Sequence, residues 1–291
     1  MAAIARAPVP LGRKRVSAGA ATAVVLATFG LLASAQAAAA APIACSTPAL
    51  VSAIAAASGG GSVTLASGCV YTLTSANNST DGGGGTGLPV ITGTVSIAGN
   101  GATIMRSTAA GTPTFRIFDV VGSGNLSLDS LTVSNGHLNN TGSTGGAGIY
   151  NHGTLSISAS TFTGNSSPSP NGVSGGAISN AGQLTVTTST FTNNQAQEGA
   201  SVFNQNTATI NQTTFANNDG TIYGGGGILN AFGTTNVYNS LFVGNTGRGG
   251  GAIDNDTTMT VVNTTFYNNS DNGSGGGAIN NFGTMTFIQS T

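Results

Sequence analysis

The strongest constraint in this sequence is an internal repeat of about 25 residues that runs from about Gly145 to Thr291. Each repeat carries a phenylalanine followed three residues later by an asparagine. It also carries a glycine-rich turn, such as GGAI, that leads to an aliphatic residue with an asparagine two places after it. The phenylalanines are Phe162, Phe191, Phe215, Phe242 and Phe266; the asparagines that follow them are Asn165, Asn194, Asn218, Asn245 and Asn269; the asparagines after the turns are Asn151, Asn180, Asn204, Asn230, Asn255 and Asn281.

Between these two marks, apolar residues alternate with serine and threonine. Leu155 and Ile157 in one repeat correspond to Leu184 and Val186 in the next. An alternation of period two with β-branched residues is typical of a strand. A repeat of about 26 residues with short strands and no helix pattern cannot bury its apolar side alone, so neighbouring repeats must stack. We therefore predict an all-β fold, a parallel β-helix (solenoid) with a short N-terminal capping helix.

In such a stack, parallel strands lie about 4.8 Å apart, and each position lies above its counterpart in the previous coil. The repeated phenylalanines are then expected to form an internal ladder. The two sets of asparagines form ladders whose side-chain amides bond from coil to coil. Glycine runs are expected to supply the bends with positive φ between strands.

The joint pattern of GGAI and F-x-x-N resembles the polymorphic outer membrane protein repeat and, more broadly, secreted parallel β-helix proteins of the pectin-lyase-like fold. The resemblance covers residues 145–291, where the motifs occur. Residues 45–144 are similar only in having strand-like segments. It implies a right-handed helix and an extracellular or cell-surface setting. The predicted organisation is a signal peptide at 1–37, an N-terminal cap with the first coils at 38–144, and the repeats at 145–291.

The N-terminus has the pattern of a secretory signal peptide. Basic residues from Arg6 to Arg15 precede an uncharged apolar stretch, and small-residue cleavage sites follow near Ala37. Cleavage would give a secreted protein without a membrane span; the alternative is a retained membrane anchor, because the uncharged stretch reaches spanning length.

The start of the exported part predicts a cap for the first coil. Thr47 as N-cap, an apolar face of Leu50, Ile54 and Ala57, and Gly59 as terminator indicate a short amphipathic helix. Cys45 and Cys69 flank this helix, and an exported chain can oxidise them, so we expect a disulfide; two free buried thiols are the alternative.

At the other end, Met285 and Phe287 occupy the two inward positions, so the next ladder phenylalanine would come one residue after Thr291. We expect a truncated repeat whose unpaired edge allows end-to-end self-association.

Charge is scarce: 7 Lys and Arg and 8 Asp and Glu give a net charge of −1, which excludes a basic nucleic-acid binder. The acids are scattered. Only Asp254 and Asp256 are expected on one face of a strand, with Arg248 in the preceding turn, and this trio is the candidate catalytic or Ca²⁺ site. The position of Asp254 varies between repeats, so a solvated surface pair is the favoured interpretation. No metal or other cofactor is expected.

These patterns predict a secreted or cell-surface, adhesin-like interaction protein without a recognisable active site, with glycans or surface proteins as its partners. The alternative is a carbohydrate-active enzyme, a polysaccharide lyase or hydrolase, because the pectin-lyase-like fold includes such enzymes. Ice binding by a threonine array is disfavoured, because the places of Thr185 and Thr187 hold Asn236 and Tyr238 in another repeat.

Overall fold

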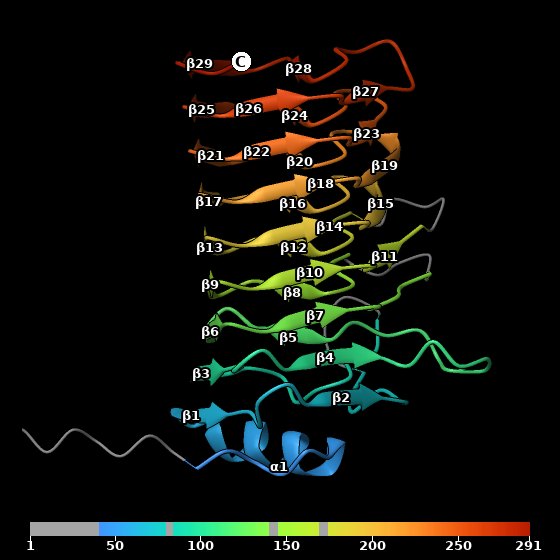
Figure 1. Cartoon of the computed structure of the whole chain (residues 1–291), viewed down its shortest axis with the longest axis vertical. Coiled ribbons are helices and arrows are strands. Elements are labelled where there is room, and N and C mark those ends of the chain that lie inside the picture. The colour runs from blue at the N-terminus through green and yellow to red at the C-terminus, as the bar shows by residue number, and fades with distance from the viewer. Residues whose placement is uncertain (1–40, 80–83, 140–144, 169–173) are drawn as a thin grey trace, which may run out of the picture. The chain divides into compact units, whose positions relative to one another are not determined.

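The computed structural model describes residues 41–79, 84–139, 145–168 and 174–291. They lie in one compact unit, Ala39–Thr291, in which parallel strands stack into a β-solenoid of about seven turns (Figure 1). The predicted parallel β-helix with one short N-terminal helix is confirmed. The predicted signal peptide, residues 1–37, lies outside the described residues.

The described strands form four parallel sheets that run along the solenoid, and we number these sheets 1 to 4. Sheet 1 contains β1 (Gly61–Thr64), β3 (Thr94–Ala98), β6 (Asn125–Asp129), β9 (Thr154–Ser158), β13 (Gln183–Thr187), β17 (Thr207–Asn211), β21 (Thr234–Tyr238), β25 (Thr258–Val262) and β29 (Thr284–Ile288). Sheet 2 contains β2 (Val70–Leu73), β4 (Thr103–Arg106), β7 (Thr132–Ser134), β10 (Thr161–Thr163), β14 (Thr190–Thr192), β18 (Thr214–Ala216), β22 (Leu241–Val243) and β26 (Thr265–Tyr267).

The other two sheets complete each coil. Sheet 3 contains β11 (Ser166–Ser167), β15 (Gln195–Glu198), β19 (Asp219–Tyr223), β23 (Thr246–Gly247) and β27 (Ser270–Asp271). Sheet 4 contains β5 (Phe118–Val120), β8 (Ile149–Asn151), β12 (Ile178–Asn180), β16 (Val202–Asn204), β20 (Ile228–Asn230), β24 (Ile253–Asn255) and β28 (Ile279–Asn281). Strands of the first coils and of the GGAI repeats pair directly, as β7 does with β10 and β6 with β9.

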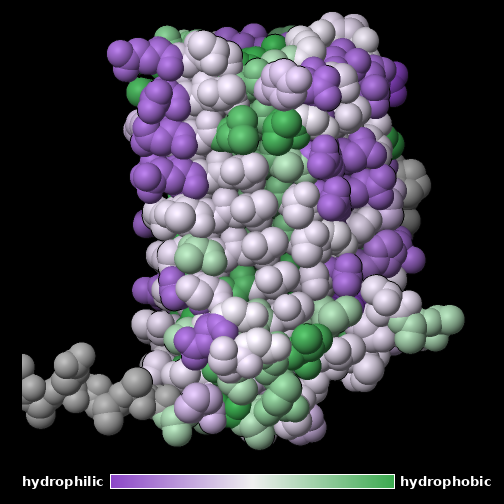
Figure 2. All heavy atoms as spheres, in the orientation of Figure 1, coloured by the Kyte–Doolittle hydropathy of each residue, from purple (hydrophilic) through white to green (hydrophobic). Residues whose placement is uncertain are grey.

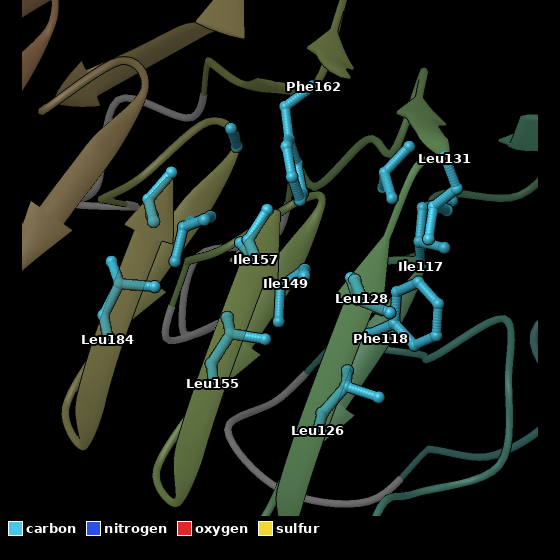
Figure 3. Packing of buried hydrophobic residues seen from close by; sticks show 14 of the residues in the cluster. Ile117, Phe118, Leu126, Leu128, Leu131, Ile149, Leu155, Ile157, Phe162 and Leu184 are labelled. Carbon is cyan, nitrogen blue, oxygen red and sulfur yellow. The ribbon is translucent and has the colours of Figure 1, made fainter. Parts of the chain in front are cut away.

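The core lies inside the coils, where equivalent residues stack. Leu126, Leu155 and Leu184 come from three successive strands of sheet 1 and project in the same direction (Figure 3). The five phenylalanines stack with their ring centroids 4.6 to 5.0 Å apart and their ring planes within 10°. Phe215, in the middle of this stack, is fully buried. The inward side of each coil is therefore a set of continuous apolar columns.

The asparagines form the two predicted ladders. After the GGAI turns, Asn180 Nδ2 donates to Asn204 Oδ1 at 2.7 Å, and the chain of such bonds runs from Asn151 to Asn281. After the phenylalanines, an equivalent chain runs from Asn165 to Asn269. The buried side-chain amides thus supply hydrogen-bond donors and acceptors for one another where the backbone turns.

The corner between sheets 1 and 2 differs from the prediction that glycine would make the bends. Non-glycine residues take a positive φ there, as Ala159 (46°) and Thr188 (49°) do. The next residue holds the bend: Ser189 Oγ donates to Thr187 O at 2.7 Å and accepts from Ser160 N of the previous coil at 3.2 Å. This second bond joins neighbouring coils and compensates for a backbone conformation that glycine would adopt more easily.

The helix α1 (Thr47–Ala57) lies across the first coil, against β1 and β2 (Figure 1). Leu50, Ile54 and Ala57 are buried as predicted, and the disulfide Cys45–Cys69 is present. The predicted N-cap was wrong by one residue. Ser46 caps the helix, because its Oγ accepts from Ala49 N, whereas Thr47 Oγ1 donates to Thr72 O at 2.8 Å.

The outer surface is polar but little charged. Figure 2 shows a face covered mostly by residues of intermediate hydropathy, with strongly hydrophilic residues gathered along its two sides. Within the described residues, no helix has the length and the apolar character needed to cross a membrane.

Candidate functional site

A groove of about 880 Å³ runs over the outer side of sheet 4 in the last coils, and it is the candidate site. Its floor is the middle residue of each three-residue strand, which points outward because both neighbours point into the core. In register along the solenoid, these floor residues are Phe203, Leu229, Asp254 and Asn280. The floor therefore changes from apolar to polar toward the last described coil.

The loops that follow sheet 3 form one wall of the groove, and glycine lets them approach the floor closely. A Cβ on Gly249 would overlap Oδ2 of Asp254, and a Cβ on Gly224 would overlap the side chain of Leu229. Gly224 also has a φ of +82°. Arg248, in one of these loops, and Tyr223, at the end of β19, also line the groove. The wall thus lies directly against the floor residues Leu229 and Asp254.

The opposite rim is a column of side chains at the place just before each strand of sheet 1. The first residues of β21, β25 and β29, which are Thr234, Thr258 and Thr284, are paired in register. The residues two places before them therefore occupy equivalent positions. These rim residues are Phe232, Asp256 and Phe282. The two phenyl rings are 72% and 78% exposed, and the carboxylate of Asp256 lies between them in the column. Tyr223, on the wall, is 64% exposed.

Asp254 is the most unusual charged group in the groove. Only 7% of its surface is exposed, and its Oδ1 accepts a 3.0 Å hydrogen bond from Asn280 Nδ2. Burial, followed by repulsion from Asp256, raises the pKa of Asp254 from 3.8 to about 6, although the bond from Asn280 opposes the shift. Asp271 adds a smaller repulsion. Near neutral pH this carboxyl is therefore poised to take up a proton.

Two further carboxylates, Asp256 and Glu198, line the same groove. Partial burial and the charge of Glu198 raise the pKa of Asp256 above its ordinary value. Glu198 comes from the end of β15, and its Oε2 accepts a hydrogen bond of 2.6 Å from Ser174 Oγ. The groove therefore concentrates negative charge, with Arg248 as the cationic side chain that lines it.

The structure brings the predicted trio together and corrects its description. Asp254, Asp256 and Arg248 all line the groove, but Asp256 follows the end of β24 instead of lying within the strand. The expectation of a solvated pair was wrong for Asp254, because the loop at Gly249 covers it, while Asp256 and Arg248 are exposed. Variation between repeats indicated an outward position but could not indicate that a loop covers it.

Sequence reasoning missed Glu198 and the aromatic residues of the groove. Phe232 and Phe282 each begin a Phe-Gly-Thr tripeptide, at 232–234 and 282–284, and this recurrence was a usable signal. Glu198 carried no such signal, since it occupies the place of Ser174 in the preceding coil.

At the other end of sheet 4, the same outward column is filled by protein. Asp119 and Tyr150 occupy the equivalent positions on β5 and β8. Buried Arg116 lies 3.8 Å from Asp119 Oδ2, and its guanidinium carbon is 4.8 Å from the centre of the Tyr150 ring. His152 packs edge-on against Tyr150. Described side chains therefore cover the outer side of the sheet at β5 and β8, whereas the later coils form the groove.

No metal-binding arrangement is evident: within residues 41–291, leaving out the undescribed gaps, no three His, Cys, Asp or Glu side chains are grouped to hold an ion. Comparisons of the chain with family models, with curated proteins and with solved structures found no match. Its function must therefore be argued from its own residues.

Proposed function

We propose that this chain is a secreted or cell-surface interaction protein that binds a glycan in the groove over sheet 4. The column Phe232, Asp256 and Phe282 carries this proposal. Exposed aromatic rings offer flat apolar faces for sugar rings, and a carboxylate between them accepts hydrogen bonds from sugar hydroxyls. A groove lined by aromatic and apolar side chains together with a few convergent polar groups is a typical ligand site.

The proposed setting rests on the sequence of the chain. The N-terminal pattern of a signal peptide and the disulfide Cys45–Cys69 favour export to an oxidising compartment. The likeness of the GGAI and F-x-x-N repeats to polymorphic outer membrane protein repeats, and to the pectin-lyase-like fold, supports a place at the cell surface.

Binding to an array of neutral, amino and acidic oligosaccharides tests the proposal. We expect the protein to bind at least one class, and the double variant Phe232→Ser, Phe282→Ser to lose that binding. Tyr267→Ser is the matched control, because Tyr267 is 68% exposed and does not line the groove. Binding that survives the double variant, or no binding to any sugar, would contradict the proposal.

A carbohydrate-cleaving enzyme is the second candidate, and the raised pKa of Asp254 beside Asp256 favours it. A carboxyl kept protonated near an ionised one is the usual acid and base pair of glycoside hydrolysis. Cleavage would then follow a bell-shaped pH profile and disappear in both Asp254→Asn and Asp256→Asn. We expect no cleavage of pectate or polygalacturonate with or without Ca²⁺; cleavage that both variants abolish would make the enzyme the better description.

A further inference from the structure

The charges of the groove indicate which class of glycan it can accept. Its described lining contains three carboxylates, Glu198, Asp254 and Asp256, against one guanidinium, that of Arg248. None of these carboxylates forms an ion pair with a described Lys, Arg or His. Among the described residues, the acids of the groove therefore outnumber its cation and are not neutralised by ion pairs.

Asp254 is the most buried carboxylate of the groove. It is more than nine-tenths buried, and its Oδ1 is bonded to Asn280. Its Oδ2 accepts no hydrogen bond from the part of the chain that the structure describes, and it lies in close contact with Gly249, which has no side chain to displace it. A carboxylate oxygen that lacks a hydrogen bond in a largely buried residue is strongly stabilised by a charged N–H donor.

We infer that the groove takes an amino sugar, a pyranose with a protonated amine, whose ammonium group lies between the carboxylates of Asp254 and Asp256 while its ring packs on Phe232 or Phe282. This inference rests on the proposed function. An ammonium group has three donors and no acceptor, which suits two carboxylates with free oxygen atoms. A uronic acid would instead add another negative charge to a groove that already has an excess.

Calorimetric titration with three oligosaccharides of equal length tests this inference: glucosamine, N-acetylglucosamine and galacturonate oligomers. The assay is run at low salt near pH 6 with EDTA, so that the sugar amines are protonated and no divalent cation competes. We expect the glucosamine oligomer to bind about tenfold more tightly than its acetylated counterpart, since acetylation removes the charge.

Variants then locate the effect. Asp254→Asn and Asp256→Asn should each bring the two affinities within about twofold of each other, mainly by weakening the glucosamine oligomer. Arg248→Gln should strengthen the binding of the glucosamine oligomer, because it removes the positive charge from the groove. Asp129→Asn is the control, because Asp129 lies on sheet 1, bonded to Ser130 and Ser158, away from the groove.

The possible failures are distinguishable. Equal binding of the amino and acetylated oligomers, lost in the double variant Phe232→Ser, Phe282→Ser, would keep the glycan site and overturn the amino-sugar inference. Tighter binding of galacturonate would also overturn it. Oligolysine that binds as tightly as glucosamine, without need of either phenylalanine, would show a site for basic peptides instead. No binding of any sugar would remove the proposed function as well.

Discussion

Asn218 Nδ2 donates a hydrogen bond of 2.8 Å to Asn245 Oδ1 in the next coil, and it donates a second bond of 3.0 Å to Phe191 O in the previous coil. Its own Oδ1 accepts two bonds, from the backbone N and the side-chain Nδ2 of Asn194. One side chain thus joins three coils. In a fold whose repeats contact only their neighbours, such a residue controls the coupling between them.

Asn218→Ala should therefore lower the free energy of unfolding by about 3 kcal/mol or more, because it leaves buried donors of Asn194 and the carbonyl of Phe191 without partners. Chemical denaturation measures the change. Asn236→Ala, on the outer side of β21, is the control and should change stability by less than about 0.5 kcal/mol. Equal effects of the two variants would mean that the ladder does not contribute to coupling.

The phenylalanine ladder predicts a cavity effect. Phe215 stacks on Phe191 at 5.0 Å and on Phe242 at 4.6 Å, and none of its surface is exposed. Phe215→Ala should lower stability by about 3 to 5 kcal/mol. Tyr267→Ala, at a mostly exposed side chain, should have little effect. A thermal midpoint of Phe215→Ala within about a degree of the parent would contradict an internal ladder.

The disulfide should stabilise the cap. Mass spectrometry without reduction is expected to show a peptide that links Cys45 and Cys69, and the double variant Cys45→Ser, Cys69→Ser should lose about 3 kcal/mol of stability. Hydrogen exchange should speed up first in α1, which the disulfide holds next to the first coil. Reducing agent should destabilise the parent and leave the double variant unchanged. If reducing agent left the parent as stable as before, the lower stability of the double variant would come from the serine substitutions and not from the lost disulfide.

The raised pKa of Asp254 predicts a pH dependence with a definite sign. The unfolded chain releases this proton near pH 3.8 and the folded chain near pH 6, so stability falls as the pH rises through this window. A shift of about two pKa units corresponds to a loss of about 3 kcal/mol in the free energy of unfolding. This loss is complete above about pH 6 and absent below about pH 4.

Asp254→Asn should remove this part of the pH dependence. Thermal midpoints of the parent and the variant should agree near pH 4 and differ near pH 7, with the variant more stable. A difference that is constant over this range would show that Asp254 titrates normally in the folded protein.

The close approach of Gly249 to Asp254 gives a steric prediction. Gly249 does not have a positive φ, so a substitution there acts through the overlap of the new Cβ with Asp254 Oδ2. Gly249→Ala should lower stability by about 1 to 3 kcal/mol and weaken ligand binding, because the carboxylate or the loop must move. Gly122→Ala, with open space around its Cβ, is the control. If both variants behaved alike, the loop would not hold Asp254 in place.

The sequence by itself determined the coils, their inward columns and both asparagine ladders. Each coil repeats the same pattern, and stacked parallel strands place equivalent residues above one another. The position of Phe215 or Asn218 in the fold follows from its place in the repeat. Thr235, the polar residue among the inward positions, also follows this rule, because its buried hydroxyl bonds to Asn230 Oδ1 and joins the ladder.

Only the tertiary structure decided what covers the outer side of each coil. The loops after sheet 3 differ in length and sequence, so no repeat rule indicates that Gly249 closes over Asp254 or that Glu198 reaches Asp256. The cap shows the same limit on a smaller scale: Thr47 has a good capping side chain, but its hydroxyl bonds to Thr72 O in a strand far along the chain, and Ser46 caps the helix instead. Contacts between segments that do not share the repeat depend on the folded chain, and the candidate site consists of such contacts.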